Sequence, residues 1–129
     1  MRTAGSARDR GSAPVEFALV SVLVVALLLA VLQLGLALHV RNTLEAAASD
    51  GARYGAAAGR RPADAAARTR ALAREALSSR FADQVDARTE SVDGLPVMVV
   101  EVRGRLPVLG LWAPVAALDV RAHAVLEQP

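Results

Sequence analysis

One uncharged, apolar stretch constrains this chain more than any other feature. From Phe17 to Leu38 the sequence holds no formally charged residue. A helix of about 22 residues rises roughly 33 Å, which matches the hydrocarbon core of a bilayer. A secretory signal peptide is the competing interpretation, but its apolar region is shorter and ends in a small-x-small cleavage site, whereas this run continues into His39, Val40 and Arg41. The sequence therefore predicts a retained membrane-spanning helix.

The charges before this stretch predict how the chain crosses the membrane. Arg2, Arg8 and Arg10 stand against a single acidic residue, Asp9. Positively charged flanks stay on the cytoplasmic side. We therefore expect a single-pass protein of the cell membrane, with a cytoplasmic N-terminus and a C-terminal domain outside.

Helical periodicity continues beyond the apolar run. Small and apolar residues recur on one face at 3.6 residues per turn, while polar residues take the other face. Residues 59–62 then supply a glycine, two arginines and a proline, which are typical of a helix end. The pattern predicts one helix over about residues 14–58. Its packing face comprises Val40, Leu44, Ala47, Ala48, Gly51, Tyr54, Gly55 and Ala58.

The rest of the chain predicts a small α+β domain. An Ala-, Leu- and Arg-rich segment over residues 63–82 favours a second, weakly amphipathic helix. Alternating patterns over residues 98–106 and 118–126 predict two strands, and a third over residues 85–91 is joined to the next by the turn dipeptide Asp93-Gly94. Residues 107–114 read as a loop that exposes Leu109, Leu111 and Trp112.

The predicted fold class is therefore α+β and membrane-anchored. A long N-terminal helix is first transmembrane and then extracytoplasmic, and it is followed by a second helix and a small antiparallel sheet of two or three strands. We divide the chain into a cytoplasmic leader at residues 1–11, a transmembrane segment at 12–39, a helix extension and linker at 40–62, and an extracytoplasmic α+β domain at 63–129.

Composition excludes several classes of function. The chain of 129 residues is too short for a multi-domain enzyme, and the absence of cysteine removes disulfide frameworks, thiolate metal sites and Cys nucleophiles. His39 and His123 have no second histidine at ligand spacing and no Ser-His-Asp set, so no catalytic residue, metal site or cofactor is expected. The net charge is only +2, and the scattered arginines are typical of a solvated helix face, so no nucleic-acid partner is expected.

A short motif, GSAPVEF at residues 11–17, stands at the entrance of the apolar run. Gly11 and Ser12 provide the extended, accessible backbone that a peptidase needs, and Pro14 suits a first helical turn. Glu16 lies at the positive end of the helix dipole, which stabilises a negative charge by up to about 1 kcal/mol. Burying it in lipid would cost about 2.5 kcal/mol or more. We therefore expect it at the interface or beside a cation, such as the new α-amino group of a neighbouring subunit.

Gly11, Glu16 and Phe17, the apolar helix and the segment NTLEAAASDGARYGA together resemble the TadE-like proteins of tight-adherence (Flp) pilus systems. The resemblance extends to the late segments VEVRGRLPVLG and LDVRAHAVLE. It implies a non-enzymatic minor pseudopilin, cut between Gly11 and Ser12 by a prepilin peptidase. Glu16 and Phe17 would set the register between subunits. The implied partners are pilin or pseudopilin subunits, the inner-membrane platform and the secretion ATPase.

Two features leave alternatives open. Ser12 and Pro14 depart from the wider type IV pilin pattern, so the alternative function is an unprocessed bitopic membrane protein whose outside domain supports an unrelated envelope complex. An exported enzyme is disfavoured because no nucleophile, base or metal site is clustered. Gly51 and Gly55 have G-x-x-x-G spacing, and with Ala47 and Ala48 they allow close backbone approach, either by the protein's own strands or by another subunit.

Overall fold

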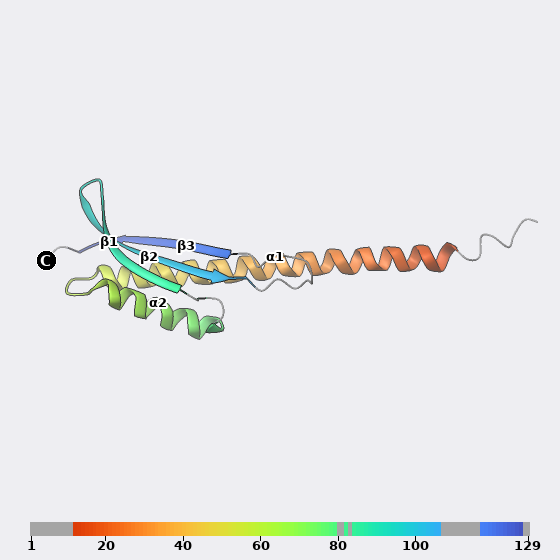
Figure 1. The fold of residues 1–129 in the computed structure, drawn as a ribbon, viewed down its shortest axis with the longest axis horizontal. Helices are drawn as coiled ribbons and strands as arrows, with labels where there is room; N and C mark the ends of the chain where they lie inside the picture. Colours follow the sequence, from red (N-terminus) through yellow and green to blue (C-terminus); the bar gives the residue numbers. More distant parts are fainter. Residues whose placement is uncertain (1–11, 80–81, 83, 107–116, 128–129) are drawn as a thin grey trace, which may run out of the picture. The chain divides into compact units, whose positions relative to one another are not determined.

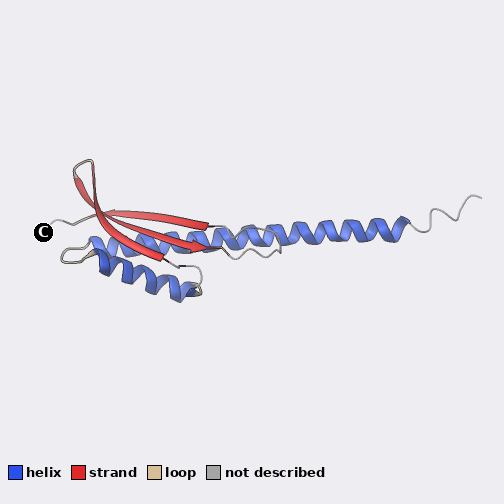
Figure 2. Cartoon of the chain, in the orientation of Figure 1, coloured by secondary structure: helices blue, strands red, loops and turns tan. Residues whose placement is uncertain are grey.

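The computed structural model describes residues 12–79, 82, 84–106 and 117–127. Its elements are α1 (Ser12–Ala56), α2 (Pro62–Ala76), β1 (Gln84–Val92), β2 (Leu95–Arg105) and β3 (Ala117–Val125) (Figures 1 and 2). The long helix, second helix and antiparallel sheet confirm the predicted fold class. The predicted leader, with Gly11, and the predicted loop with Leu109, Leu111 and Trp112 lie outside the described residues.

The chain divides into two compact units, Met1–Gly35 and Leu36–Pro129. In the first unit, the described part is the N-terminal portion of α1. The second unit contains the C-terminal portion of α1 together with α2 and the sheet. The whole predicted helix extension and linker, residues 40–62, thus belongs to the same compact unit as the α+β elements. The membrane boundaries proposed from the sequence stay predictions.

Helix α1 begins at Ser12 and ends at Ala56, which confirms the prediction of one long helix. Each end lies two residues nearer the N-terminus than predicted. Pro14 is accommodated in the first turn, where a missing N–H removes no intrahelical bond. At the other end the backbone N–H of Glu127 donates to the carbonyl of Ala56 at 2.9 Å. A residue from the far end of the sequence therefore satisfies a terminal carbonyl of α1.

Helix α2 starts one residue before the predicted start at residue 63 and ends earlier than predicted. Pro62 takes its first position, and the backbone N–H of Arg61 donates to Asp64 Oδ2 at 2.9 Å. The helix ends at Ala76 and not at residue 82, so the predicted C-terminal boundary is wrong. Leu77 adopts an extended conformation and packs partly buried against the core. Burial of this leucine, followed by two serines of low helix propensity, overrides the local Ala- and Arg-rich pattern.

The three strands form an antiparallel sheet in the order β1-β2-β3. Val92 pairs with Leu95 across the first hairpin, which leaves Asp93 and Gly94 as a two-residue turn. Their φ angles of 51° and 81° are both positive, as a type I′ turn requires. The predicted third strand and its Asp-Gly turn are thus confirmed.

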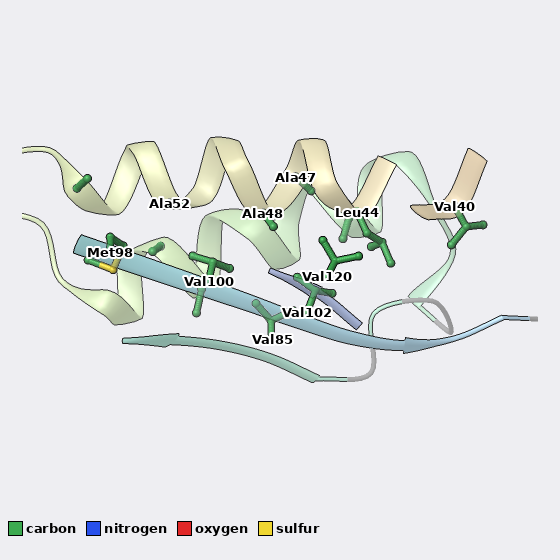
Figure 3. Close-up of a cluster of buried hydrophobic side chains, with 14 residues drawn as sticks. Val40, Leu44, Ala47, Ala48, Ala52, Val85, Met98, Val100, Val102 and Val120 are labelled. Carbon is green, nitrogen blue, oxygen red and sulfur yellow. The ribbon is translucent and has the colours of Figure 1, made fainter. Parts of the chain in front are cut away.

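The core of the second unit lies between the sheet and the helices (Figure 3). Met98, Val100 and Val102 of the central strand β2 are fully buried on its inner face. Val40, Leu44, Ala48 and Ala52 of α1 line the helix side of the same core (Figure 3). The C-terminal portion of α1, from Leu36 onward, is therefore a core helix of this unit. The sheet covers its apolar stripe.

Candidate functional site

The N-terminal part of α1 presents an apolar surface that nothing in the described structure covers. Its large side chains, from Val15 to Leu38, are exposed all round the helix. Within the described residues, α1 is the one helix long and apolar enough to cross a membrane. The hydroxyl of Ser21 donates to the carbonyl of Phe17 at 2.8 Å, so this polar group is satisfied within the helix. Such a surface suits a hydrocarbon environment.

The entrance residues Ser12, Glu16 and Phe17 all lie in the first turns of α1 and are exposed. Within the part of the chain that the structure describes, the Glu16 carboxylate has no hydrogen bond or ion pair. Its position near the helix N-terminus is favourable for a negative charge. The roles of these residues in processing and subunit register stay predictions.

The glycines of the predicted packing face meet α2 at very short range. A Cβ added at Gly51 would lie 1.8 Å from Thr69 Oγ1 and 2.9 Å from the Ala65 carbonyl oxygen. A Cβ added at Gly55 would lie 2.4 Å from Ala65 Cβ. Only glycine allows this approach. The partner of these two glycines is therefore a helix of the same chain, where the sequence suggested a strand or another subunit.

The other members of the packing face divide between core and margin. Ala47 and Ala48 are buried, and so are Ala52 and Ala56, which the predicted stripe omitted. The buried arc is broad because α1 is covered by both the sheet and α2.

Tyr54 and Ala58 were predicted on the packing face but are exposed at its margin. The Tyr54 ring lies 4.0 Å from the guanidinium carbon of Arg60, which also donates to the tyrosine hydroxyl. Arg68 lies on the same ring at 5.8 Å and forms an ion pair with Asp50 at 3.0 Å. Cation–π contact thus holds this tyrosine beside the helix pair.

An ionic network covers part of the sheet face that points away from the helices. The Arg88 guanidinium donates to Glu90 at 2.5 Å and to Glu101 at 3.1 Å, and Arg103 donates to Glu101 at 2.7 Å. Arg121 lies 3.7 Å from Glu90. These hydrogen bonds, first from Arg103 and then from Arg88, lower the pKa of Glu101.

The pKa shift predicts a pH dependence of stability. A carboxyl whose pKa is lower in the folded state adds stability that is complete above its unfolded value of about 4.3 and is lost as the pH falls through the folded value. Glu101→Gln should therefore show a smaller drop in Tm on acidification than the wild type. Thermal melts of the full chain in detergent micelles, at pH values above and below about 4.3, would measure this drop in Tm. The exposed Glu75→Gln serves as control, and equal drops in all three proteins would contradict the prediction.

No three residues of the His, Asp and Glu types cluster closely enough to hold a metal ion within the described ranges. His39 lies on α1 and His123 on β3, and both are exposed.

Comparison with protein families gives a match for the N-terminal part. Residues 11–53 match the family model described as TadE-like protein. The TadE-like segment covers the predicted cut, Glu16, Phe17, the apolar run and most of the packing face, and it ends before Tyr54 and Gly55. The TadE-like family is associated with Tad pilus assembly and is structural, not enzymatic.

The TadE-like match does not reach α2 or the sheet. The late segments in which the sequence also showed a resemblance lie outside it. No curated protein and no solved structure matches the chain.

Proposed function

We propose that this chain is a minor pseudopilin that acts in the assembly of a tight-adherence (Flp-type) pilus. The observation that carries the proposal is the TadE-like match over residues 11–53, which falls on an exposed, apolar helix. The same helix contributes Val40 and Leu44 to the core of the second unit. In this proposal α1 is both the membrane anchor and a helix that packs into the core of the domain. The protein acts by anchoring and contact, without catalysis.

In this proposal the N-terminus is cytoplasmic and the α+β domain lies outside. A prepilin peptidase cuts between Gly11 and Ser12, which creates a new α-amino group at Ser12. The exposed Glu16, which has no partner within the described residues, supports a role as its counter-ion on a neighbouring subunit. Phe17 then contributes apolar contact between the same two subunits. The other partners are pilin or pseudopilin subunits and the inner-membrane platform.

Intact-mass analysis of the protein from membranes tests the processing step. We expect a mature N-terminus at Ser12 in cells that contain the peptidase, and retention of residues 1–11 both in cells without it and in the Gly11→Leu variant. The loss should be all-or-none, because a bulky side chain removes the accessible backbone that the peptidase needs.

Gly35→Leu is the matched control, since a Cβ at Gly35 meets no atom within 4 Å. It should be processed like the wild type. If the leader persists in every sample, the proposal fails and the unprocessed bitopic alternative is favoured.

A further inference from the structure

The described sheet has two outer edges, one on β1 and one on β3 (Figure 1). The N–H of Leu126 donates to the carbonyl of Pro96, so the even-numbered residues of β3 point their backbone groups at β2. Backbone groups alternate in direction along a strand, so the odd-numbered residues of β3 point their backbone groups away from the sheet. The Glu127 N–H agrees, since it donates to Ala56 and not to β2. The outer edge of β3 is thus formed by Ala117, Asp119, Arg121, His123 and Val125.

The same alternation assigns the outer edge of β1. Even-numbered residues of β2 bond to β3, so its odd-numbered residues bond to the even-numbered residues of β1. The odd-numbered residues of β1 therefore point outward. Arg70 Nη2 of α2 donates to the carbonyl of Val85 at 2.7 Å, as this assignment requires. Among the described residues, the outward backbone groups of Ala87, Thr89 and Ser91 have no partner.

Neither edge carries the features that usually prevent another strand from adding. Strands β1 and β3 contain no proline, glycine or lysine, and their registers with β2 run without a bulge. The side chains that β3 directs at the core are all apolar, and Leu118, Ala122 and Ala124 are only partly buried. An added strand would cover them further. Unpaired N–H and C=O groups in a row are complemented by the backbone of another extended strand.

We propose that the β3 edge of one copy pairs with the β1 edge of a second copy and continues its sheet. Strands β1 and β3 run in the same direction, because each is antiparallel to β2. Parallel pairing of the two edges therefore keeps the core-facing side of both sheets on one side. The contact involves the second unit alone, so it depends neither on the placement of the first unit nor on removal of residues 1–11.

The backbone groups of the two edges are in phase for this pairing. In a parallel pair, a residue that points at the neighbouring strand lies opposite a residue that points away, and it bonds to the two residues on either side of that one. Asp119 points outward from β3, whereas Arg88 points inward at β2. With Asp119 opposite Arg88, the Asp119 N–H donates to the Ala87 carbonyl, and the Thr89 N–H donates to the Asp119 carbonyl.

The charges select this register. It places Asp119 opposite Arg88 and Arg121 opposite Glu90, and all four side chains lie on the outer face of the sheet. Opposite charges on directly paired residues are favourable, and like charges are unfavourable. A shift by two residues in one direction sets Asp119 against Asp86 and Arg121 against Arg88. The same shift in the other direction sets Asp119 against Glu90.

The core-facing side of the seam is free of charge in the selected register. Leu118 lies opposite Ala87, and Ala122 lies opposite Ser91. The contact joins two different edges, so it is heterologous and leaves one β1 edge and one β3 edge open at its ends. Further copies can therefore add, whereas a contact between identical surfaces stops at two.

The absence of cysteine lets a pair of introduced thiols report this seam. In the proposed register Val92 of one copy lies opposite His123 of the next, and both are exposed. Paired strands are about 4.8 Å apart, which suits the Cα separation of a disulfide. Within one copy the same two residues lie on opposite sides of β2 and four residues apart in register, or roughly 16 Å, which is too far for a disulfide.

Mild oxidation of the full chain in detergent micelles tests the proposal. Val92→Cys/His123→Cys should form disulfide-linked species of two, three and more chain masses. Each single-cysteine variant should form little dimer and nothing larger. Val92→Cys/Val125→Cys is the control for register, since its thiols are displaced by two residues, or roughly 8 Å between Cα atoms. Its yield should be severalfold lower.

A second pair of variants tests the backbone contact. The Thr89 N–H points away from β2, so Thr89→Pro removes no bond of its own sheet but removes a donor at the seam. In the Val92→Cys/His123→Cys background it should reduce the linked species severalfold. Thr89→Val keeps the N–H and the branched side chain, and it should leave the yield unchanged.

Four outcomes would overturn the proposal. They are no linked species despite complete thiol labelling, equal yields from the two cysteine pairs, equal yields from Thr89→Pro and Thr89→Val, and a product whose mass includes another protein. The mass of the same samples reports separately whether residues 1–11 are present. A failure of the sheet pairing is therefore distinguishable from a failure of the proposed processing.

Discussion

Gly51→Val is expected to destabilise the second unit by about 3 kcal/mol or more, among the largest effects of any single substitution in the chain. Even the first added carbon would lie 1.8 Å from Thr69 Oγ1 and 2.9 Å from the Ala65 carbonyl oxygen. Helix α2 must move away from α1, and the buried Thr69 must change its surroundings. Denaturant unfolding of the full chain in detergent micelles, followed by circular dichroism, would measure the loss.

The same substitution at Gly35 is the control. Gly35 is also in α1, but a Cβ there meets no atom within 4 Å. Gly35→Val should leave the stability of the second unit within about 0.5 kcal/mol of the wild type. Adding Thr69→Ala to Gly51→Val should recover only part of the loss, since the Ala65 backbone remains in the way. A stable Gly51→Val protein would show that the close helix approach is not needed.

Leu44→Ala should lower the free energy of unfolding by 2–5 kcal/mol, or about 3 kcal/mol as a central expectation. Leu44 is 0% exposed and is one of the largest fully buried side chains of the second unit. Its removal leaves a cavity between α1 and the sheet, next to Val40 and Val102, that the backbone can fill only in part. The same unfolding measurement applies.

Leu38→Ala is the matched control for this substitution. Leu38 is 52% exposed on the same helix, and its truncation opens no cavity. We expect a change of less than about 1 kcal/mol. Similar losses for the two variants would contradict the assignment of Leu44, and not Leu38, to the core. The comparison also tests whether the core begins beyond the apolar run.

Much of the fold could be predicted from local patterns. The length of α1 follows from an apolar run that continues into a 3.6-residue stripe, and the first hairpin follows from Asp93 and Gly94, which tolerate positive φ. The end of α2 could not be predicted, because the burial of Leu77 depends on a sheet that is remote in the sequence. The hydrogen bond from Glu127 to the terminal carbonyl of Ala56 could not be predicted for the same reason, since the two residues are far apart along the chain.

In the candidate site, too, local features could be predicted and contacts between distant segments could not. The entrance motif with Glu16 and Phe17 could be singled out because it is a run of consecutive residues, and its role in processing stays a prediction. Gly51 and Gly55 were recognised as positions of close approach, but their neighbour was not. The apolar run from Val97 to Val100 was a signal of burial on both faces of β2 that strict alternation hides.

The sequence by itself therefore determined the long apolar helix and the order of the elements, since helix and strand periods are local properties of the chain. Only the tertiary structure decided which element covers each face. It placed α2 against the glycines of α1 and made β1 and β3 the outer edges of the described sheet. Periodicity tells which residues share a face, whereas packing between distant segments decides what that face meets.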